Sequence, residues 1–284
     1  MNQILVLIMT ASLMSVSFPA PVEQLLFPLG PKMNDPSLGD TQSLGLIPAP
    51  ASDPAFKTPD WVKNAIFYQI FPDRFRDGNA ANNPENGDLL WKEWSRGDAN
   101  YAQKMNWTDL PEEPASGRDW FGGDLQGVQE KAQYLADLGV TAIYFNPLMD
   151  STDNHGYTVI DYKSVNRYFG ANKRAETGTP EVDIEGGLEV FRNMTSELDK
   201  YGIRVILDGV FNHVSAKHQW FDRDNDYPTD GAYESQSSQW YTWFNFSNWP
   251  NYYRGWQGFL NLREVNEVAK FKNYVYMDPN DSVI

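Results

Sequence analysis

Three short apolar runs alternate with two helical repeats in the middle of this chain, and this alternation constrains the fold more than any other feature. Residues 65–70, 140–145 and 205–207 are rich in β-branched and aromatic side chains, as buried strands are. Between these runs, apolar residues recur at helical spacing over residues 124–139 and 187–201. The order strand, helix, strand, helix, strand predicts an α/β fold with a parallel sheet.

Polar side chains gather directly after the third apolar run. Asp208 ends the run, and Asn212 and His213 follow within five residues. The carboxyl ends of parallel strands commonly form the catalytic face of α/β proteins. We therefore expect this stretch to belong to a functional site; the alternative is an ordinary strand with a hydrogen-bonded Asp and a turn Asn.

Composition narrows the class of partner. The chain has 284 residues, enough for an enzyme, and its 38 acidic against 23 basic residues give a net charge of -15. This charge disfavours nucleic acid, anionic membranes and other polyanions. Ten Trp and fifteen Tyr offer flat amphipathic faces that suit sugar rings. The absence of cysteine excludes disulfides and thiolate metal sites.

The first 59 residues precede the predicted domain. Residues 4–20 are apolar enough for a signal peptide, so we predict secretion, with residues 1–20 as the leader. No Lys or Arg precedes the run, and four hydroxyl residues interrupt it, which disfavours a membrane anchor. The alternatives are a buried segment of a larger protein or a misplaced start. Residues 21–59 are rich in Pro, Gly, Asp and Ser and are predicted to be a linker.

Two long stretches lack strand or helix periodicity. The polar stretch from about residue 72 to 121 is predicted to be a functional loop, since long loops in compact domains usually are. Residues 240–259 hold ten aromatics in twenty positions. We interpret most of these aromatics as a small core of their own, with a few facing a ligand.

Four sequence blocks carry a family resemblance. They are Tyr68-Gln69-Ile70-Phe71-Pro72-Asp73-Arg74-Phe75, Gly122-Gly123-Asp124-Leu125, Gly156-Tyr157 with Asp161-Tyr162, and Asp208-Gly209-Val210-Phe211-Asn212-His213. Together they resemble the α-amylase family of glycoside hydrolases, family 13. The first block resembles its neopullulanase, cyclomaltodextrinase and amylopullulanase group.

This resemblance implies an architecture. Residues 60–284 would be the amino-terminal part of a (β/α)8 TIM barrel, with about three of the eight strands and the active site at their carboxyl ends. Residues 214–266 would form an aromatic-rich insertion after the third strand.

The resemblance also implies substrate-binding residues. Asp208 and His213 match residues that line the subsite of the sugar whose bond is cut; His213 would donate to a ring hydroxyl and Asp208 would orient the catalytic groups. Tyr157 matches a tyrosine that stacks on the same sugar, and His155 is a candidate hydroxyl partner. His218 lies outside the blocks and is interpreted as an ordinary loop residue, and Asp161 as a structural carboxylate.

A second constellation suggests calcium. Asp77, Asn79, Asn82 and Asn83 place oxygen-bearing side chains within seven residues, and calcium prefers such oxygens on flexible loops. The alternative is a plain Asx-rich turn. The family resemblance favours calcium and adds the Gly122 carbonyl and Asp124 to the ligands. Few of these ligands are acidic, so a weak site is expected.

The catalytic residues of the family are expected beyond Ile284. Retaining glycosidases need a carboxylate nucleophile and a carboxyl acid/base about 5 Å apart, and the family takes both from later strands. We therefore expect a fragment of a retaining hydrolase of starch, pullulan or cyclodextrins that is inactive alone. The alternatives are a non-catalytic glucan-binding module or remnant, in which Tyr157, Trp243, Trp249 and Trp256 bind sugar, and a membrane-anchored inactive relative.

Overall fold

The computed structural model of the chain describes residues 5–7, 58–92, 99–111, 117–174, 180–255 and 262–265. It divides into two compact units, residues 1–10 with 65–284, and residues 11–64. The described part of the smaller unit contains helix α1 (Asp60–Lys63), in which Lys63 pairs with Asp60 across one turn. All other elements belong to the larger unit.

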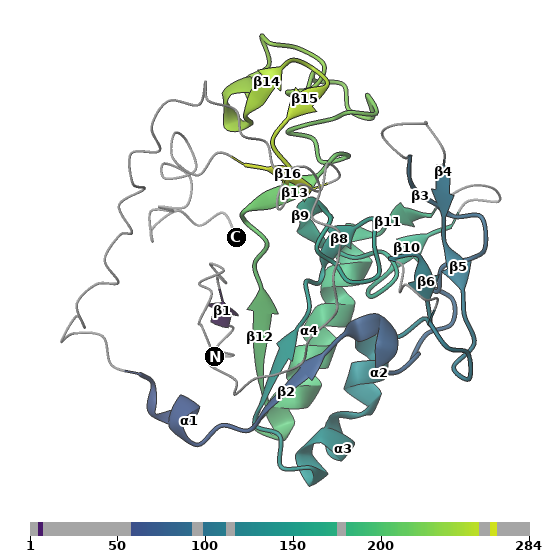
Figure 1. Ribbon diagram of the computed structural model, residues 1–284. Coiled ribbons are helices and arrows are strands. Elements are labelled where there is room, and N and C mark those ends of the chain that lie inside the picture. The colour runs from purple at the N-terminus through teal and green to yellow at the C-terminus, as the bar shows by residue number, and fades with distance from the viewer. Residues whose placement is uncertain are drawn as a thin grey trace, which may run out of the picture. The chain divides into compact units, whose positions relative to one another are not determined.

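A four-stranded parallel sheet organises the larger unit (Figure 1). Its strands, in spatial order, are β1 (Leu5–Leu7), β12 (Arg204–Asp208), β7 (Ala142–Phe145) and β2 (Phe67–Ile70). The three predicted strands are confirmed as β2, β7 and β12, and their neighbours pair in sequence order. The sheet is open, and the residues that the structure describes form no closed barrel.

Strand β1 lies within the predicted leader. It pairs in parallel with β12, with Leu7 in register with Asp208. An unpaired strand edge exposes backbone N–H and C=O groups, which any neighbouring extended segment can bond. An apolar run can therefore serve as an edge strand, and its composition alone does not distinguish an edge strand from a signal peptide.

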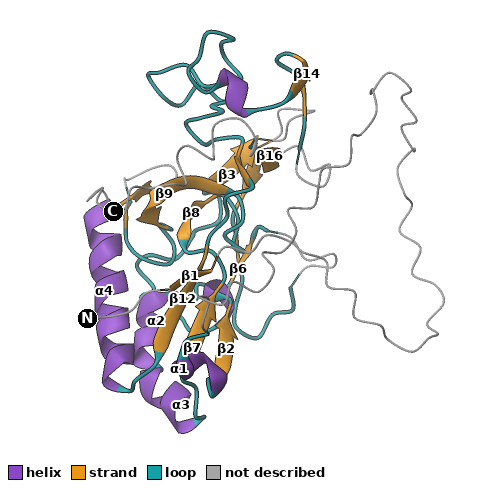
Figure 2. Cartoon of the chain, turned by 90° about the vertical axis from the view of Figure 1, so that its left-hand side faces the viewer, coloured by secondary structure: helices purple, strands orange, loops and turns teal. Residues whose placement is uncertain are grey.

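Three helices cover one face of the sheet (Figure 2). They are α2 (Leu125–Glu130), α3 (Ala132–Asp137) and α4 (Ile184–Lys200). The side chain of Asp124 caps α2 by accepting a hydrogen bond from Gly127 N at 2.7 Å, and Asp183 caps α4 in the same way. The single helix predicted over residues 124–139 is interrupted at Lys131, whose ψ of 10° is not helical.

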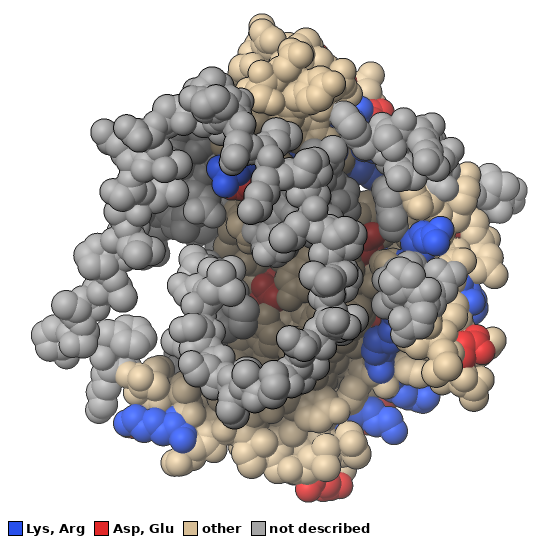
Figure 3. All heavy atoms as spheres, in the orientation of Figure 1, with Lys and Arg blue, Asp and Glu red and all other residues tan. Residues whose placement is uncertain are grey.

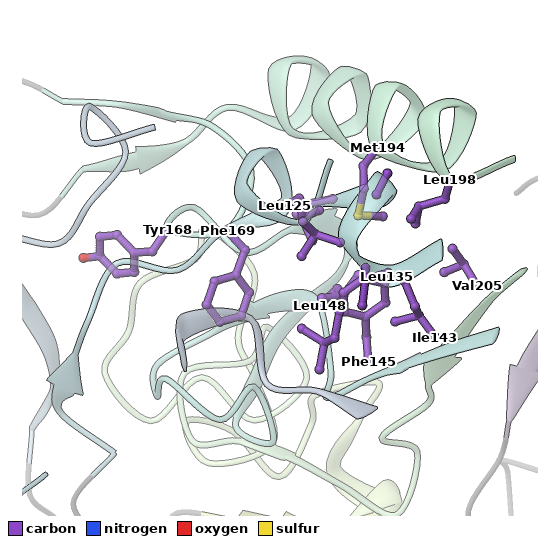
Figure 4. Close-up of a cluster of buried hydrophobic side chains, with 14 of the residues drawn as sticks. Leu125, Leu135, Ile143, Phe145, Leu148, Tyr168, Phe169, Met194, Leu198 and Val205 are labelled. Atoms are coloured by element: carbon purple, nitrogen blue, oxygen red, sulfur yellow. The ribbon is translucent and has the colours of Figure 1, made fainter. Parts of the chain in front are cut away.

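The main core lies between these helices and the sheet (Figure 4). Met194 and Leu198 point from α4 toward the side chains of the sheet and of α2 (Figure 4). Both are fully buried, as are Leu125 on α2 and Ile143 on β7. The repeat of apolar residues in α4 thus places one stripe against the sheet, which fixes the strand ends beside which the site is built.

The predicted long loop contains more structure than expected. Its elements are η1 (Pro72–Arg74), β3 (Leu89–Lys92), β4 (Ala99–Tyr101), β5 (Gln103–Lys104) and β6 (Asp119–Trp120). Later connections contain β8 (Met149–Ser151), β9 (Val159–Val165), β10 (Asn172–Lys173) and β11 (Glu181–Val182). All of these strands except the seven-residue β9 have only two to four residues, too few for an alternating pattern to be recognised in sequence.

The insertion after β12 has its own small core. Strand β13 (His213–Ser215) pairs with β16 (Leu262–Glu264), and η2 (Tyr241–Trp243), β14 (Phe246–Asn248) and β15 (Tyr252–Tyr253) lie between them in sequence. Phe221, Trp243, Phe244 and Tyr253 are buried together in it. This confirms that most aromatics of the segment pack against one another; Trp256 lies outside the described residues.

The surface of the chain is mixed in charge despite its acidic total. Lys and Arg side chains gather on the right-hand side of the face shown in Figure 3. Among the described helices, none combines the length and the apolar composition needed to cross a bilayer.

Candidate functional site

Asp208 is the centre of a hydrogen-bonded cluster at the carboxyl end of β12. Its side chain is buried, and its Oδ2 accepts hydrogen bonds from the hydroxyls of Tyr157 at 2.8 Å and Tyr144 at 2.5 Å. Tyr144 lies on β7 in register with Ile206, two residues before Asp208, so the two side chains are diagonal neighbours on one face. Among the described residues, none donates a hydrogen bond to Oδ1 of Asp208.

His213 joins this cluster from the first position of β13. Its Nε2 lies 3.0 Å from the carbonyl oxygen of Tyr157, and its Nδ1 lies 2.5 Å from Asn212 Nδ2. Because a carbonyl can only accept, Nε2 carries the ring proton. Burial lowers the pKa of His213 below its ordinary value, so the ring is neutral at pH 7. The proton that the resemblance assigned to a sugar hydroxyl is engaged by the Tyr157 carbonyl in this structure.

His155 completes the predicted set. Its Nδ1 accepts a hydrogen bond from the backbone N–H of Tyr157 at 3.1 Å, and its ring centre lies 5.8 Å from that of Tyr157. Gly156 between them has φ +82°, and a Cβ there would lie 2.2 Å from the Pro147 carbonyl oxygen. Only glycine allows this turn. The structure therefore brings all four predicted substrate-binding residues together.

Asp161 and His218, which are interpreted as lying outside the predicted site, both have structural contacts. Asp161 accepts hydrogen bonds from Lys163 N and Ser164 Oγ, which confirms a structural carboxylate. His218 lies in the turn after β13, in agreement with its interpretation as a loop residue, and it is buried there. It is 5% exposed, and its ring centre lies 4.3 Å from that of Trp220. Burial lowers the pKa of His218 to about 3, so this ring is neutral and part of the packing.

Asp73 links two of the four sequence blocks, a role that the sequence did not indicate. Its fully buried carboxylate accepts hydrogen bonds from Phe121 N and Gly122 N, each at 3.0 Å, and it pairs with Arg74. Arg74 also donates to the Asp119 carbonyl at 2.6 Å. Burial raises the pKa of Asp73 to about 7, although Arg74 and the two amides oppose the rise. Asp73 thus holds the Gly122 loop in place.

Asp73 should make stability depend on pH. Its pKa in the folded chain lies above its ordinary value of 3.8, so the folded state gains a proton first as pH falls. The melting temperature is expected to rise between pH 8 and pH 6.5. Below pH 6.5 buried His213 and His218 oppose further stabilisation, because their pKa values are lowered on folding. Thermal melts between pH 8 and pH 6.5 test this expectation, and the melting temperature of Asp73→Asn should rise less over the same interval. An equal rise in that variant would contradict the attribution of the pH dependence to Asp73.

Asp124 connects the Gly122 loop to the predicted calcium loop. Its Oδ1 accepts hydrogen bonds from Gly78 N at 3.1 Å and Gly127 N at 2.7 Å, and its Oδ2 accepts one from Asn79 N at 2.9 Å. Burial raises the pKa of Asp124 to about 6, and the charge of Asp77 adds to the rise. A cation beside these two carboxylates would relieve both effects.

The other predicted calcium ligands lie in the same region. Asn83 Nδ2 donates to Asp77 Oδ2 at 2.8 Å, and a Cβ on Gly122 would lie 2.7 Å from the Asn83 amide. Asn82 Nδ2 donates to the Gly170 carbonyl at 3.0 Å. The loop is therefore folded against the Gly122 turn, with the side-chain nitrogens of both Asn residues used by the protein.

The amide oxygens of the loop fit a hard cation. Oδ1 of Asn82 and Oδ1 of Asn83 are both buried and accept no hydrogen bond from the described residues. Orphaned buried oxygens of this kind require an explanation such as an ion or water. No group of three or more His, Asp or Glu side chains in the described part of the chain is arranged for a metal, so any site here depends on amide and carbonyl oxygens.

Comparison with known proteins identifies the family. The family model "Alpha amylase, catalytic domain" matches residues 69–260, about two thirds of the chain. The chain belongs to the α-amylase family. The match includes the Asp208, Tyr157 and His213 cluster and most of the aromatic insertion.

Individual relatives agree with this α-amylase assignment. The chain is 36% identical over 211 residues to an amylopullulanase of Thermoanaerobacterium saccharolyticum, covering 67% of this chain and 15% of that protein. It is 35% identical over 159 residues to neopullulanase 2 of Thermoactinomyces vulgaris, covering 56% and 21%. The chain therefore spans only a small part of the length of these relatives.

Solved structures of α-amylase relatives match the fold. The type III pullulan hydrolase of Thermococcus kodakarensis matches with a TM-score of 0.61 and 31% identity, covering 78% of this chain and 36% of that one. A cyclic α-maltosyl-(1→6)-maltose hydrolase of Arthrobacter globiformis, in complex with that cyclic sugar, matches with a TM-score of 0.59 and 26% identity, covering 78% and 41%.

Proposed function

We propose that this chain supplies the substrate-positioning part of a retaining α-glucan hydrolase. The observation that supports this most directly is the cluster of Asp208, Tyr157 and His213 at the carboxyl end of β12. A carboxylate oxygen and an aromatic ring at one point offer a hydroxyl acceptor and an apolar surface for the same sugar. The Arthrobacter relative has been solved with a cyclic maltosyl-maltose.

In the proposed complex, these residues bind and orient the sugar and take no part in breaking the glycosidic bond. Tyr157 would place its ring against the apolar face of a glucosyl unit while its hydroxyl remains on Asp208. Oδ1 of Asp208 would accept a hydrogen bond from one sugar hydroxyl. His155, whose side chain is about one third exposed, would form a hydrogen bond with another hydroxyl. We place the nucleophile and the acid/base beyond Ile284, so the chain alone binds sugar without cleaving it.

Calorimetric titration with maltotriose tests this function. The chain is expected to bind the sugar, and Asp208→Asn is expected to weaken binding roughly tenfold, since it removes a charged acceptor from the site. Asp230→Asn, the same change at an exposed position of the insertion, is the matched control and should leave affinity unchanged. Absence of binding by the unmodified chain would refute the proposed function. Release of reducing sugar would refute the proposal that the chain alone does not cleave the sugar.

We also propose that calcium binds the loop of Asp77, Asn79, Asn82 and Asn83, with Asp124 and the Gly122 carbonyl. The orphaned oxygens of Asn82 and Asn83 support this. Binding would be structural, because it would hold this loop against the Gly122 turn.

Added calcium is expected to raise the melting temperature. At a hundredfold excess over Kd the rise should be about 5 °C. Asn83→Ala should abolish it, because that change removes an uncompensated oxygen, whereas Asn248→Ala on exposed β14 should keep it. Identical melts in calcium and in EDTA would exclude a calcium site at this loop.

A further inference from the structure

Tyr144 is the member of the Asp208 cluster that neither the sequence blocks nor the proposed function uses. It lies on β7 between Ile143 and Phe145, which are fully buried in the core, while Tyr144 itself is only half-buried. Strand alternation therefore turns it to the sheet face away from the helices. There its hydroxyl reaches Oδ2 of Asp208 at 2.5 Å.

Two hydroxyls share one carboxylate oxygen in this cluster. Tyr157 approaches Oδ2 of Asp208 from the loop after β8, and Tyr144 approaches it from the neighbouring strand. Burial and the Asp208 charge raise the pKa of both phenols, that of Tyr157 to about 12. Both hydroxyls therefore stay protonated and donate. Oδ1 accepts no such bond from the described residues, so the two oxygens of one carboxylate have different roles.

We propose that Tyr144 is a positioning residue that, together with Tyr157, fixes Oδ2 of Asp208 and so presents Oδ1 to a hydroxyl of the bound glucan. This rests on the proposed function for the identity of the ligand. In the proposed function Tyr157 also contacts the sugar, and it lies in a loop directly after Gly156, whereas Tyr144 lies on β7, which pairs with β2 on one side and β12 on the other. Tyr144 is thus the rigid donor of the two.

The test is a double-mutant cycle on maltotriose affinity. Tyr144→Phe, which removes only the hydroxyl, is expected to weaken binding about fivefold, the usual effect of one hydrogen bond. In the Asp208→Asn background the same change should alter affinity less than about twofold, because the group through which Tyr144 acts is gone. Tyr233→Phe, which removes a hydroxyl bonded to Asn251 in the insertion, is the matched control with no expected effect.

A second readout does not need sugar. The ¹³C resonance of the Asp208 carboxyl, assigned as the signal lost in Asp208→Asn, is expected to shift in Tyr144→Phe and not in Tyr233→Phe. An unshifted resonance, or an equal loss of affinity in both backgrounds, would overturn the role of Tyr144. If the unmodified chain binds no maltotriose but the resonance shifts, the proposed function fails while the positioning of Asp208 by Tyr144 stands.

Discussion

Asp73→Ala is expected to lower the free energy of unfolding by roughly 3–5 kcal/mol, the range seen when one partner of a buried charge pair is removed. The carboxylate is fully buried, and its loss leaves Phe121 N and Gly122 N without their acceptor and removes the charged partner of Arg74, which keeps its bond to the Asp119 carbonyl. Each orphaned buried donor adds its desolvation cost. For a unit of this size the melting temperature should fall by about 10 °C.

Two further variants sharpen this result. Asp73→Asn keeps one acceptor oxygen for the two amides, so it should lose less stability than Asp73→Ala. Glu130→Ala removes an ion pair with Arg76 in which both side chains are more than 40% exposed, and its melting temperature should stay close to that of the unmodified chain. A melt of Asp73→Ala within about 1 °C of the unmodified chain would show that the Gly122 loop does not depend on Asp73.

Arg263→Met is expected to stabilise the chain, by roughly 1–3 kcal/mol. Arg263 on β16 is fully buried, and none of its three guanidinium nitrogens has a hydrogen-bond partner in the part of the chain that the structure describes. Its charge lies over the rings of Tyr253 at 4.2 Å and Phe221 at 4.9 Å. Such cation–π contacts return only part of the desolvation cost of a buried charge. Burial accordingly lowers the pKa of Arg263 to about 9.

The matched control for Arg263→Met is Arg254→Met. Arg254 is about two thirds exposed and pairs with Glu264 at 2.8 Å, so its loss should change the melting temperature little. Thermal melts of both variants measure whether the buried guanidinium of Arg263 lowers or raises the stability of the chain. A clear drop in the melting temperature of Arg263→Met would mean that the buried guanidinium contributes net stability to the insertion.

The parallel sheet was predictable because its strands carry a strong local signal. β7 lies between the two predicted helical segments and β12 follows the second of them, and the capping residues Asp124 and Asp183 stand at the helix starts. The short strands β3 to β6 were not predictable, since pairs of two to four residues are specified by tertiary contacts and not by alternation.

The candidate site was predictable in its residues but not in its bonds. Asp208, Tyr157 and His213 could be selected from sequence blocks, yet nothing local shows that Tyr157 uses its hydroxyl on Asp208 or that His213 uses its proton on the Tyr157 carbonyl. Tyr144 was missed because an aromatic in a strand is usually a packing residue. Asp73 was missed because its partners lie nearly fifty residues away.

The pairing of β1 with β12 has a consequence for assembly. Leu5–Leu7 occupies the strand edge next to Asp208, and a strand edge can hold one partner at a time. Any other segment that is to lie beside β12 must first displace these residues. Proteolytic removal of the first twenty residues would also empty that edge. Pairing of any other segment with this edge of β12 would therefore require strand exchange with Leu5–Leu7.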